Sequence, residues 1–267
     1  MDTRINKYSK QLIIINSIFI LFWLTISIFP FIWTLWGSFK VKADFFSRAE
    51  WTYALSGFNT LIETGATTTV KAYIESWTEG EFWRASMNTM IVTVSVVSIS
   101  LFLGTLGAYA LSRSTYKYTF YILIAALIFR AMPHITLVSG YLFPFFQLNI
   151  WGILPTTIIV LVAINQPFTL WLLYSFFKTV PKELDESALI DGCSYFQAFR
   201  YIIMPVMWPG VVTAGLFSMM LAYNDFTVTA LLLNQENYTM VPKINAYLGT
   251  VEYLSLIHIS EPTRPTP

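Results

Sequence analysis

Residues 181–205 read PKELDESALIDGCSYFQAFRYIIMP and form a charged interruption between two strongly apolar stretches of the chain. Gly192 lies near the middle of this helix-forming segment. A glycine costs a helix about 1 kcal/mol relative to alanine, so Gly192 predicts a bend between two short helices. Pro181 suits a first helical turn, and the acidic residues after it would lie near the positive end of the helix dipole. The segment predicts a short acidic helix on an aromatic base.

The composition of the whole chain is that of a membrane protein. Of its 267 residues, 55% are hydrophobic and 12% are charged, whereas about 25% are charged in an average soluble domain. Crossing a bilayer takes roughly 20 mostly apolar residues. Five stretches are long and apolar enough: 12–35, 88–111, 119–143, 153–177 and 205–233. The first is too long for a cleavable signal peptide. We therefore expect an all-α polytopic membrane protein.

The basic residues of the short loops predict how the chain is oriented. If the five stretches alternate in direction, residues 1–11, 112–118 and 178–204 lie on one side of the membrane. These segments carry Arg4, Lys7, Lys10, Arg113, Lys117, Lys178, Lys182 and Arg200, whereas the opposite short loops carry only Lys243. Cytoplasmic loops are enriched in lysine and arginine. The amino terminus and the charged segment are therefore predicted to face the cytoplasm, with the long loop 38–87 outside.

The charged segment resembles the EAA loop of ABC importer permeases. That family's pattern is E-A-A, three residues, G, nine residues and I-x-L-P, and residues 186–205 match it in register. Ser187 replaces the second-position alanine and Met204 replaces the leucine. Other motifs resemble the maltose-type, carbohydrate-importing branch of the family, in the expected order: NTMIV (88–92), GAYALSR (107–113), RAMP (130–133), PFTLWLL (167–173) and YNDF (223–226). The resemblance implies the type I importer permease fold, with five spans present and a sixth expected but apparently truncated.

In the resembled family, this loop enters a cleft on a separate ATPase subunit. The resemblance implies that Glu186 pairs with a basic residue of the ATPase and that Gly192 allows the bend. Asp191 is expected to make a local cap or a loop contact and not to act as a catalytic acid. The full set of implied ATPase-coupling residues is Glu183, Asp185, Glu186, Ser187, Ala188, Asp191, Gly192, Phe196 and Phe199. The alternative is a merely solvated amphipathic loop.

The chain holds no G-x-x-x-x-G-K-[ST] motif with which to cradle ATP. We therefore expect ATP and Mg²⁺ on the partner subunit. On this chain we expect no cofactor, no metal site and no catalytic residue.

Polar residues inside the predicted spans are candidates for the translocation path, because a charge there costs about 2.5–3.5 kcal/mol on insertion scales. The candidates are Arg130, Asn165, Asn224 and Asp225. For Arg130 the alternative is anchoring to backbone carbonyls or to a partner permease. For Asn165, which precedes Pro167, the alternative is a simple helix kink. Asn224 and Asp225 are predicted to lie near the middle of the fifth span and to face the lumen.

The resemblance also implies partners and a location. These are a second permease in a heterodimer, two ABC ATPase copies, and an extracytoplasmic binding protein that contacts the loop 234–253. The expected location is the lipid bilayer of a bacterial or archaeal plasma membrane. The net charge of +1 gives no reason to expect nucleic acid.

Three alternatives to a carbohydrate importer were considered. An importer of a non-sugar solute would share the same motifs. A stand-alone secondary transporter would use Arg130, His134 and Asp225 as an ion path, but it would not explain the acidic glycine-centred loop. A membrane-embedded enzyme has no metal-spaced cluster to support it.

The last residues of the chain predict a foreign tail. The stretch LSLIHISEPTR (254–264) resembles a translated transposase adapter used in DNA library preparation, and the adapter codons fit every residue. We therefore expect residues 254–267 to be non-native. The predicted organisation is a cytoplasmic amino terminus (1–11) and a permease domain (12–253) that includes the outer loop 38–87 and the cytoplasmic loop 178–204.

Overall fold

The computed structural model describes residues 2–38, 73–74 and 76–248. The chain divides into two compact units, Met1–Glu81 and Phe82–Pro267, and each is described by itself. The described residues form helices and no extended strand; their only strand-like pairing is an isolated bridge between Gly152 and Leu233. Within these residues, four helices are long and apolar enough to cross a membrane, or five if one bent pair counts as a span. The predicted all-α fold is confirmed, and the number of membrane-spanning helices is roughly consistent with the five predicted.

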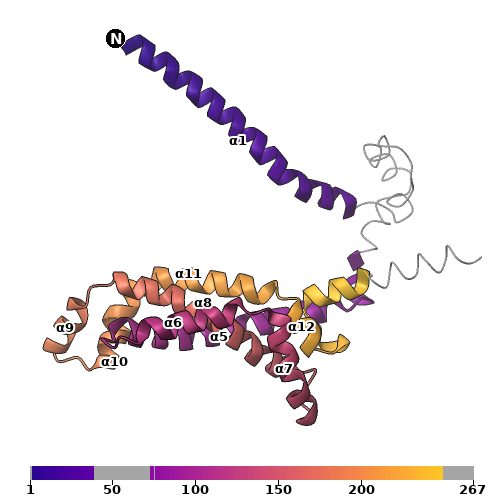
Figure 1. The fold of residues 1–267 in the computed structure, drawn as a ribbon. Helices are drawn as coiled ribbons and strands as arrows, with labels where there is room; N and C mark the ends of the chain where they lie inside the picture. The colour runs from indigo at the N-terminus through magenta and orange to yellow at the C-terminus, as the bar shows by residue number, and fades with distance from the viewer. Residues whose placement is uncertain (1, 39–72, 75, 249–267) are drawn as a thin grey trace, which may run out of the picture. The chain divides into compact units, whose positions relative to one another are not determined.

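The first unit contains helix α1 (Asp2–Ser38), drawn in indigo in Figure 1. Its apolar part, Leu12–Leu35, has exposed side chains within this unit and coincides with the first predicted span. A helix pairs its backbone groups within itself, so such a segment is stable in lipid without a protein partner. Pro30 lies inside the helix, and the hydroxyl of Thr34 donates to the Pro30 carbonyl at 2.6 Å.

The second unit is a bundle in which α5 (Phe82–Arg113), α8 (Leu154–Thr179) and α11 (Met204–Tyr223) pack on one another (Figure 1). Helix α6 (Thr119–Ala131) lies against α8. Small residues allow the close approach: a Cβ on Gly104 of α5 would lie 3.0 Å from the Thr169 side chain of α8. Helix association in lipid depends on such packing, because lipid is as apolar as the side chains.

The structure corrects the third predicted span, 119–143. Helix α6 ends at Ala131 and α7 (His134–Gln147) continues at an angle of 86°. Pro133 lies in the break, where its missing N–H prevents the helix from running on. The pair is therefore either a broken span or a re-entrant loop, not the single continuous helix that hydropathy predicted.

The structure also corrects the fifth predicted span, 205–233. Helix α11 ends at Tyr223, and a separate short helix, α12 (Thr227–Leu232), follows. The cause is the side chain of Asp225, whose Oδ1 accepts hydrogen bonds from the backbone N–H groups of Val228 (2.8 Å) and Thr229 (3.2 Å). Asn224 and Asp225 therefore lie at a break between helices and not within one continuous helix.

The loop 178–204 and the α12 region lie at opposite ends of this bundle (Figure 1). At the end that carries α12, the side chain of Asn88 on α5 donates to the Tyr238 carbonyl, and the Asn237 side chain donates to the Gly152 carbonyl at 2.7 Å. Residues 240–248 are helical. Helix α5 begins at Phe82, before the predicted start at Asn88. Most of the predicted outer loop 38–87, and the predicted tail 254–267, lie outside the described residues.

Candidate functional site

The segment 178–204 folds as two short helices joined by a glycine turn. Helix α9 (Glu183–Ile190) ends just before Gly192, which has φ = +87°, and α10 (Tyr195–Ala198) begins three residues later. The N–H of Gly192 donates to the Leu189 carbonyl at 3.1 Å and that of Cys193 to the Ala188 carbonyl at 3.0 Å. Glycine adopts this left-handed conformation without the steric cost that a Cβ adds. The predicted bend at Gly192 is confirmed.

The start of α10 is capped by its own side chains. The Ser194 hydroxyl accepts from the N–H of Gln197 at 3.3 Å, and the Gln197 side chain accepts from the N–H of Ser194 at 2.8 Å. This reciprocal capping box stabilises a four-residue helix that is too short to be stable alone. A π-helical turn, Phe199–Ile203, then leads into α11. The loop is therefore a defined structure that would present the same surface to any partner.

Helix α9 has two different faces. Glu183, Glu186 and Ser187 are exposed, whereas Asp185 and Ala188 are buried. Ala188 faces the rest of the unit, and Leu184 packs on its core cluster. The outer face therefore presents carboxylates to the surroundings. Beside it lie three exposed apolar side chains: Ile190, Tyr195 and Phe196. An acidic surface rimmed by apolar side chains is suited to a protein partner with basic and apolar groups.

Asp185 points away from that outer face, toward the ends of α5 and α8. Its Oδ2 lies 2.8 Å from Nη2 of Arg113, the last residue of α5. Its Oδ1 accepts a hydrogen bond of 2.6 Å from the Tyr109 hydroxyl. Arg113 Nη1 also donates to the carbonyls of Val180 (3.0 Å) and Phe177 (3.3 Å) at the carboxyl end of α8. The sequence analysis used Arg113 as an orienting charge and placed both residues in the motif GAYALSR (107–113), but it predicted no contact of either with the charged loop.

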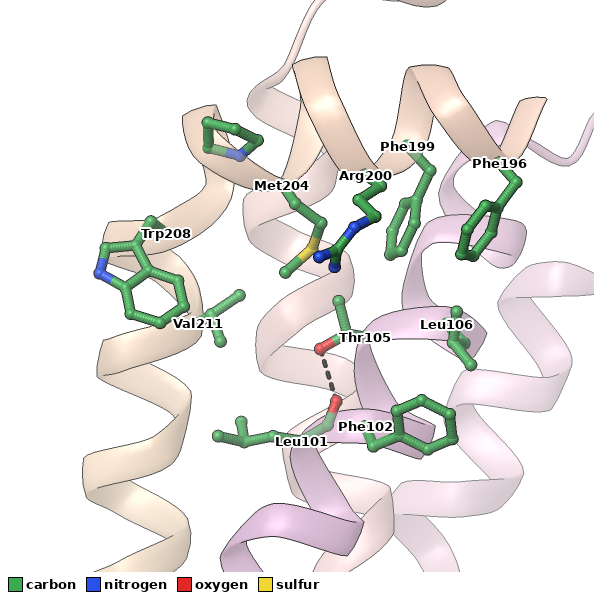
Figure 2. A pocket seen from close by; sticks show the side chains of 11 residues that line it. Leu101, Phe102, Thr105, Leu106, Phe196, Phe199, Arg200, Met204, Trp208 and Val211 are labelled. Carbon is green, nitrogen blue, oxygen red and sulfur yellow. Dashed lines mark hydrogen bonds between the residues drawn. The ribbon is translucent and has the colours of Figure 1, made fainter. Parts of the chain in front are cut away.

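Phe196 and Phe199 line an apolar cavity of about 870 Å³ between the loop and the membrane helices (Figure 2). Leu101, Phe102 and Leu106 of α5 line one side, and Met204, Trp208 and Val211 of α11 line the other. The Arg200 side chain extends into the cavity between Met204 and Phe199 (Figure 2). Phe199 also packs on Tyr109, with ring centroids 4.8 Å apart. The predicted aromatic base of the loop is therefore present, although Phe196 remains 66% exposed.

The structure places two of the predicted path residues in contacts between helices. The Asn165 side-chain amide, 4% exposed, donates to the Ser218 hydroxyl at 3.1 Å and so joins α8 to α11. Arg130 donates to the Ile164 carbonyl at 3.3 Å and lies 5.4 Å from the centre of the Phe168 ring. This carbonyl contact corresponds to the anchoring alternative for Arg130. Helix α8 continues through Pro167.

The other two predicted path residues make hydrogen bonds close to their own positions in the chain. The side-chain amide of Asn224 donates to the Met220 carbonyl at 2.9 Å, and Asp225 caps the start of α12. A path role for these residues, and for Arg130 and Asn165, stays a prediction. In the described part of the chain, no three His, Cys, Asp or Glu side chains are grouped so that they could hold a metal ion.

These features define a multi-pass membrane protein whose helical bundle carries a structured acidic loop at one end. Residues 100–257 match the family described as "Binding-protein-dependent transport system inner membrane component", and the chain belongs to that family. The chain is thus the permease component of a binding-protein-dependent ABC transporter, as its EAA-like loop predicted.

Two transport-system permease proteins are similar to this chain over most of its length. The diacetylchitobiose uptake system permease protein NgcG of Streptomyces coelicolor is 28% identical over 90% of this chain and 76% of its own length. The trehalose/maltose transport system permease protein MalG of Thermococcus litoralis is 31% identical over 81% of this chain and 74% of its own length.

A solved structure shares the fold. It is described as a bacterial ABC transporter involved in the import of the acidic polysaccharide alginate. It aligns with a TM-score of 0.65 and 17% identity, over 92% of this chain and 86% of the matched chain.

Proposed function

We propose that this chain is one permease subunit of an ATP-driven importer that takes up a carbohydrate delivered by an extracytoplasmic binding protein. ATP and Mg²⁺ would be bound by a separate ATPase, present in two copies, and a second, different permease would complete the path. This subunit itself would carry no catalytic residue. The amino terminus and the loop 178–204 would face the cytoplasm, and the loop 38–87 and residues 234–253 would face outward.

The observation that carries this proposal is the two-faced helix α9. Its exposed carboxylates, Glu183 and Glu186, lie beyond the membrane helices. Its other face is bound to these helices through the ion pair of Asp185 with Arg113. A loop that was only solvated would not need a buried aspartate, a capping box and a glycine turn to hold its shape. The rigid acidic surface supports docking of an ATPase, with Glu186 opposite a basic side chain.

The opposite end of the unit supports docking of the binding protein. The segment 234–248 is held there by the contacts of Asn88 and Asn237, so it forms a fixed surface at that end of the unit. Residues 249–253 of the predicted docking loop lie outside the described residues. Closure of the ATPase pair would then move α9 and switch the bundle between outward-facing and inward-facing states.

A disaccharide or oligosaccharide is the proposed solute class, because NgcG is named for diacetylchitobiose and MalG for trehalose and maltose. A non-sugar solute is the second candidate. A stand-alone secondary transporter is less well supported, since it would not explain the acidic glycine-centred loop, and Arg130 and Asp225 each bind groups of their own chain.

An uptake assay tests the proposal. The chain is co-produced with a candidate ATPase, second permease and binding protein, and the complex is placed in proteoliposomes with ATP inside. We expect ATP-dependent accumulation of at least one radiolabelled sugar among diacetylchitobiose, trehalose and maltose. Accumulation that persists without ATP, or without the ATPase subunit, would contradict the importer. Uptake of an amino acid or ion in place of every sugar would contradict the solute class.

A further inference from the structure

We propose that Arg113 and Asp185 form a positioning pair that fixes helix α9 to the ends of α5 and α8, so that α9 and these membrane helices move together. This inference rests on the proposed coupling function of α9, which it deepens. It assigns Asp185 a different task from Glu183 and Glu186, although all three carboxylates lie in one turn of the same helix.

The first argument is geometric. One guanidinium group reaches three elements: its Nη2 lies 2.8 Å from Asp185 of α9, and its Nη1 donates to Val180 and Phe177 at the end of α8. The arginine itself is the last residue of α5. A planar guanidinium with several N–H donors can make such simultaneous contacts, whereas a lysine ammonium cannot match them. From the end of α5, the Arg113 side chain thus contacts both α8 and α9.

The second argument is that the pair is shielded from water. The exposed fractions of the two side chains are 16% for Arg113 and 13% for Asp185. Tyr109 holds the other carboxylate oxygen at 2.6 Å, and its ring packs on Phe177 and Phe199. Hydrogen bonds to an ionised carboxylate are shorter and stronger than neutral ones. Removing one partner of a shielded pair leaves the other charge uncompensated, so the arrangement resists separation.

The third argument concerns the carbonyls of α8. The last carbonyl groups of a helix have no partner within the helix, and a cation there also interacts favourably with the helix dipole. Arg113 supplies two of these hydrogen bonds while it holds Asp185. A displacement of α9 that keeps the ion pair must therefore pull on the end of α8 as well as on α5. The pair is placed to carry motion from the docking surface into the bundle.

Hydrogen exchange on the full chain in lipid nanodiscs tests the positioning role without any partner subunit. In Asp185→Asn, which removes the charge but keeps the size, the amides of residues 185–193 should exchange about tenfold faster than in the parent chain. The matched control is Glu186→Gln, the exposed neighbour in the same turn, which should leave exchange unchanged. Equal exchange in Asp185→Asn and the parent would overturn the proposal.

A charge swap separates the pair from a general loss of folding. Arg113→Asp alone should speed exchange in the same segment, and adding Asp185→Arg should restore part of the protection. Full restoration is not expected, because an aspartate at 113 cannot donate to the α8 carbonyls. A double variant no better protected than Arg113→Asp would contradict a direct interaction between the two positions.

The assembled transporter gives a readout that a purely structural role would not change. Asp185→Asn should still co-purify with the ATPase, because the outer face of α9 is untouched. It should consume about tenfold more ATP for each molecule of diacetylchitobiose, trehalose or maltose taken up. A normal ratio would overturn the coupling role. If Glu186→Lys also retained the ATPase, the docking proposal would fail, whereas the exchange result for Asp185 would still decide the positioning role.

Discussion

Gly210 of α11 lies directly against Phe176 of α8: a Cβ at position 210 would be 2.8 Å from the ring carbon Cγ of Phe176. Real Cβ contacts are essentially never that short, so the backbone of α11 approaches α8 as closely as it does only because residue 210 has no side chain. A similar close approach at a glycine occurs between Gly104 and Thr169, where α5 packs on α8. Close contacts between backbone and side chain thus set the distances between the helices that carry the loop.

Gly210→Ala should therefore destabilise the bundle. The added methyl group must displace Phe176, and overpacking of this kind costs typically about 1–3 kcal/mol. The measurement is unfolding in detergent micelles, followed by the midpoint of thermal aggregation or of denaturant-induced loss of helicity. The control is Gly140→Ala in α7, where an added Cβ would meet nothing within 4 Å. Gly140→Ala should leave the stability unchanged or raise it slightly. An equal loss of stability in both variants would contradict a steric cause at position 210.

Gly192→Ala should weaken the loop through the backbone, since the space around Gly192 is open. A residue with a Cβ at φ = +87° costs about 1–2 kcal/mol. We expect lower uptake with the bundle still folded, and a larger loss for Gly192→Pro, whose ring fixes φ near −65°. The uptake rate of Gly192→Asn should lie between those of the parent and Gly192→Ala, because asparagine tolerates left-handed conformations better than alanine. Unchanged uptake in all three variants would show that the bend is not needed.

Glu186→Lys should reduce binding of the ATPase subunit. The exposed carboxylate would become a cation opposite a basic side chain, and like charges across an interface cost several kcal/mol. Retention of the ATPase during co-purification in rising salt measures this loss. Glu236→Lys, an equally exposed reversal at the far end of the unit, should leave retention at the parental level. Loss of the ATPase in both variants would point to a change in net charge, not to docking at α9.

Asn165→Ala should loosen the contact between α8 and α11 by removing two hydrogen bonds to Ser218. A double-mutant cycle with Ser218→Ala gives the interaction energy. Hydrogen bonds between membrane helices measured in this way average about 0.6 kcal/mol, so a coupling near that value is expected. A coupling of zero would show that the two side chains do not support each other. Loss of uptake with unchanged stability would support the path role predicted for Asn165.

The helices of this protein follow largely from local composition. The apolar stretch 12–35 predicts helix Leu12–Leu35, because 24 residues without a charge form a helix long enough to cross the hydrocarbon core of a bilayer. Gly192 and the acidic turn before it predict the two-helix loop, because the conformational cost of glycine and the helix dipole act within a few residues. The class of permease could also be predicted, because the EAA-like spacing lies in one continuous segment.

Other features depend on groups that are distant in the sequence. Hydropathy could not show that the third span bends by 86° at Pro133, or that Asp225 starts a new helix, because both stretches remain apolar on average. It also could not separate Asp185 from Glu186. The two residues are adjacent and chemically similar, and only the position of Arg113, 72 residues earlier in the chain, distinguishes a buried partner from an exposed one.

The sequence by itself determined that the chain is helical, that it spans a membrane, and that residues 178–204 form an acidic, glycine-hinged loop. These properties arise from transfer free energies and backbone preferences, which each short segment carries alone. Only the tertiary structure decided which carboxylate of α9 faces outward and which is held by Arg113. It also decided that the Asn165 side chain hydrogen-bonds to Ser218 and that the Phe176 ring packs against the backbone at Gly210. Hydrogen bonds and steric contacts act over a few ångströms, so they exist only after folding has brought those helices together.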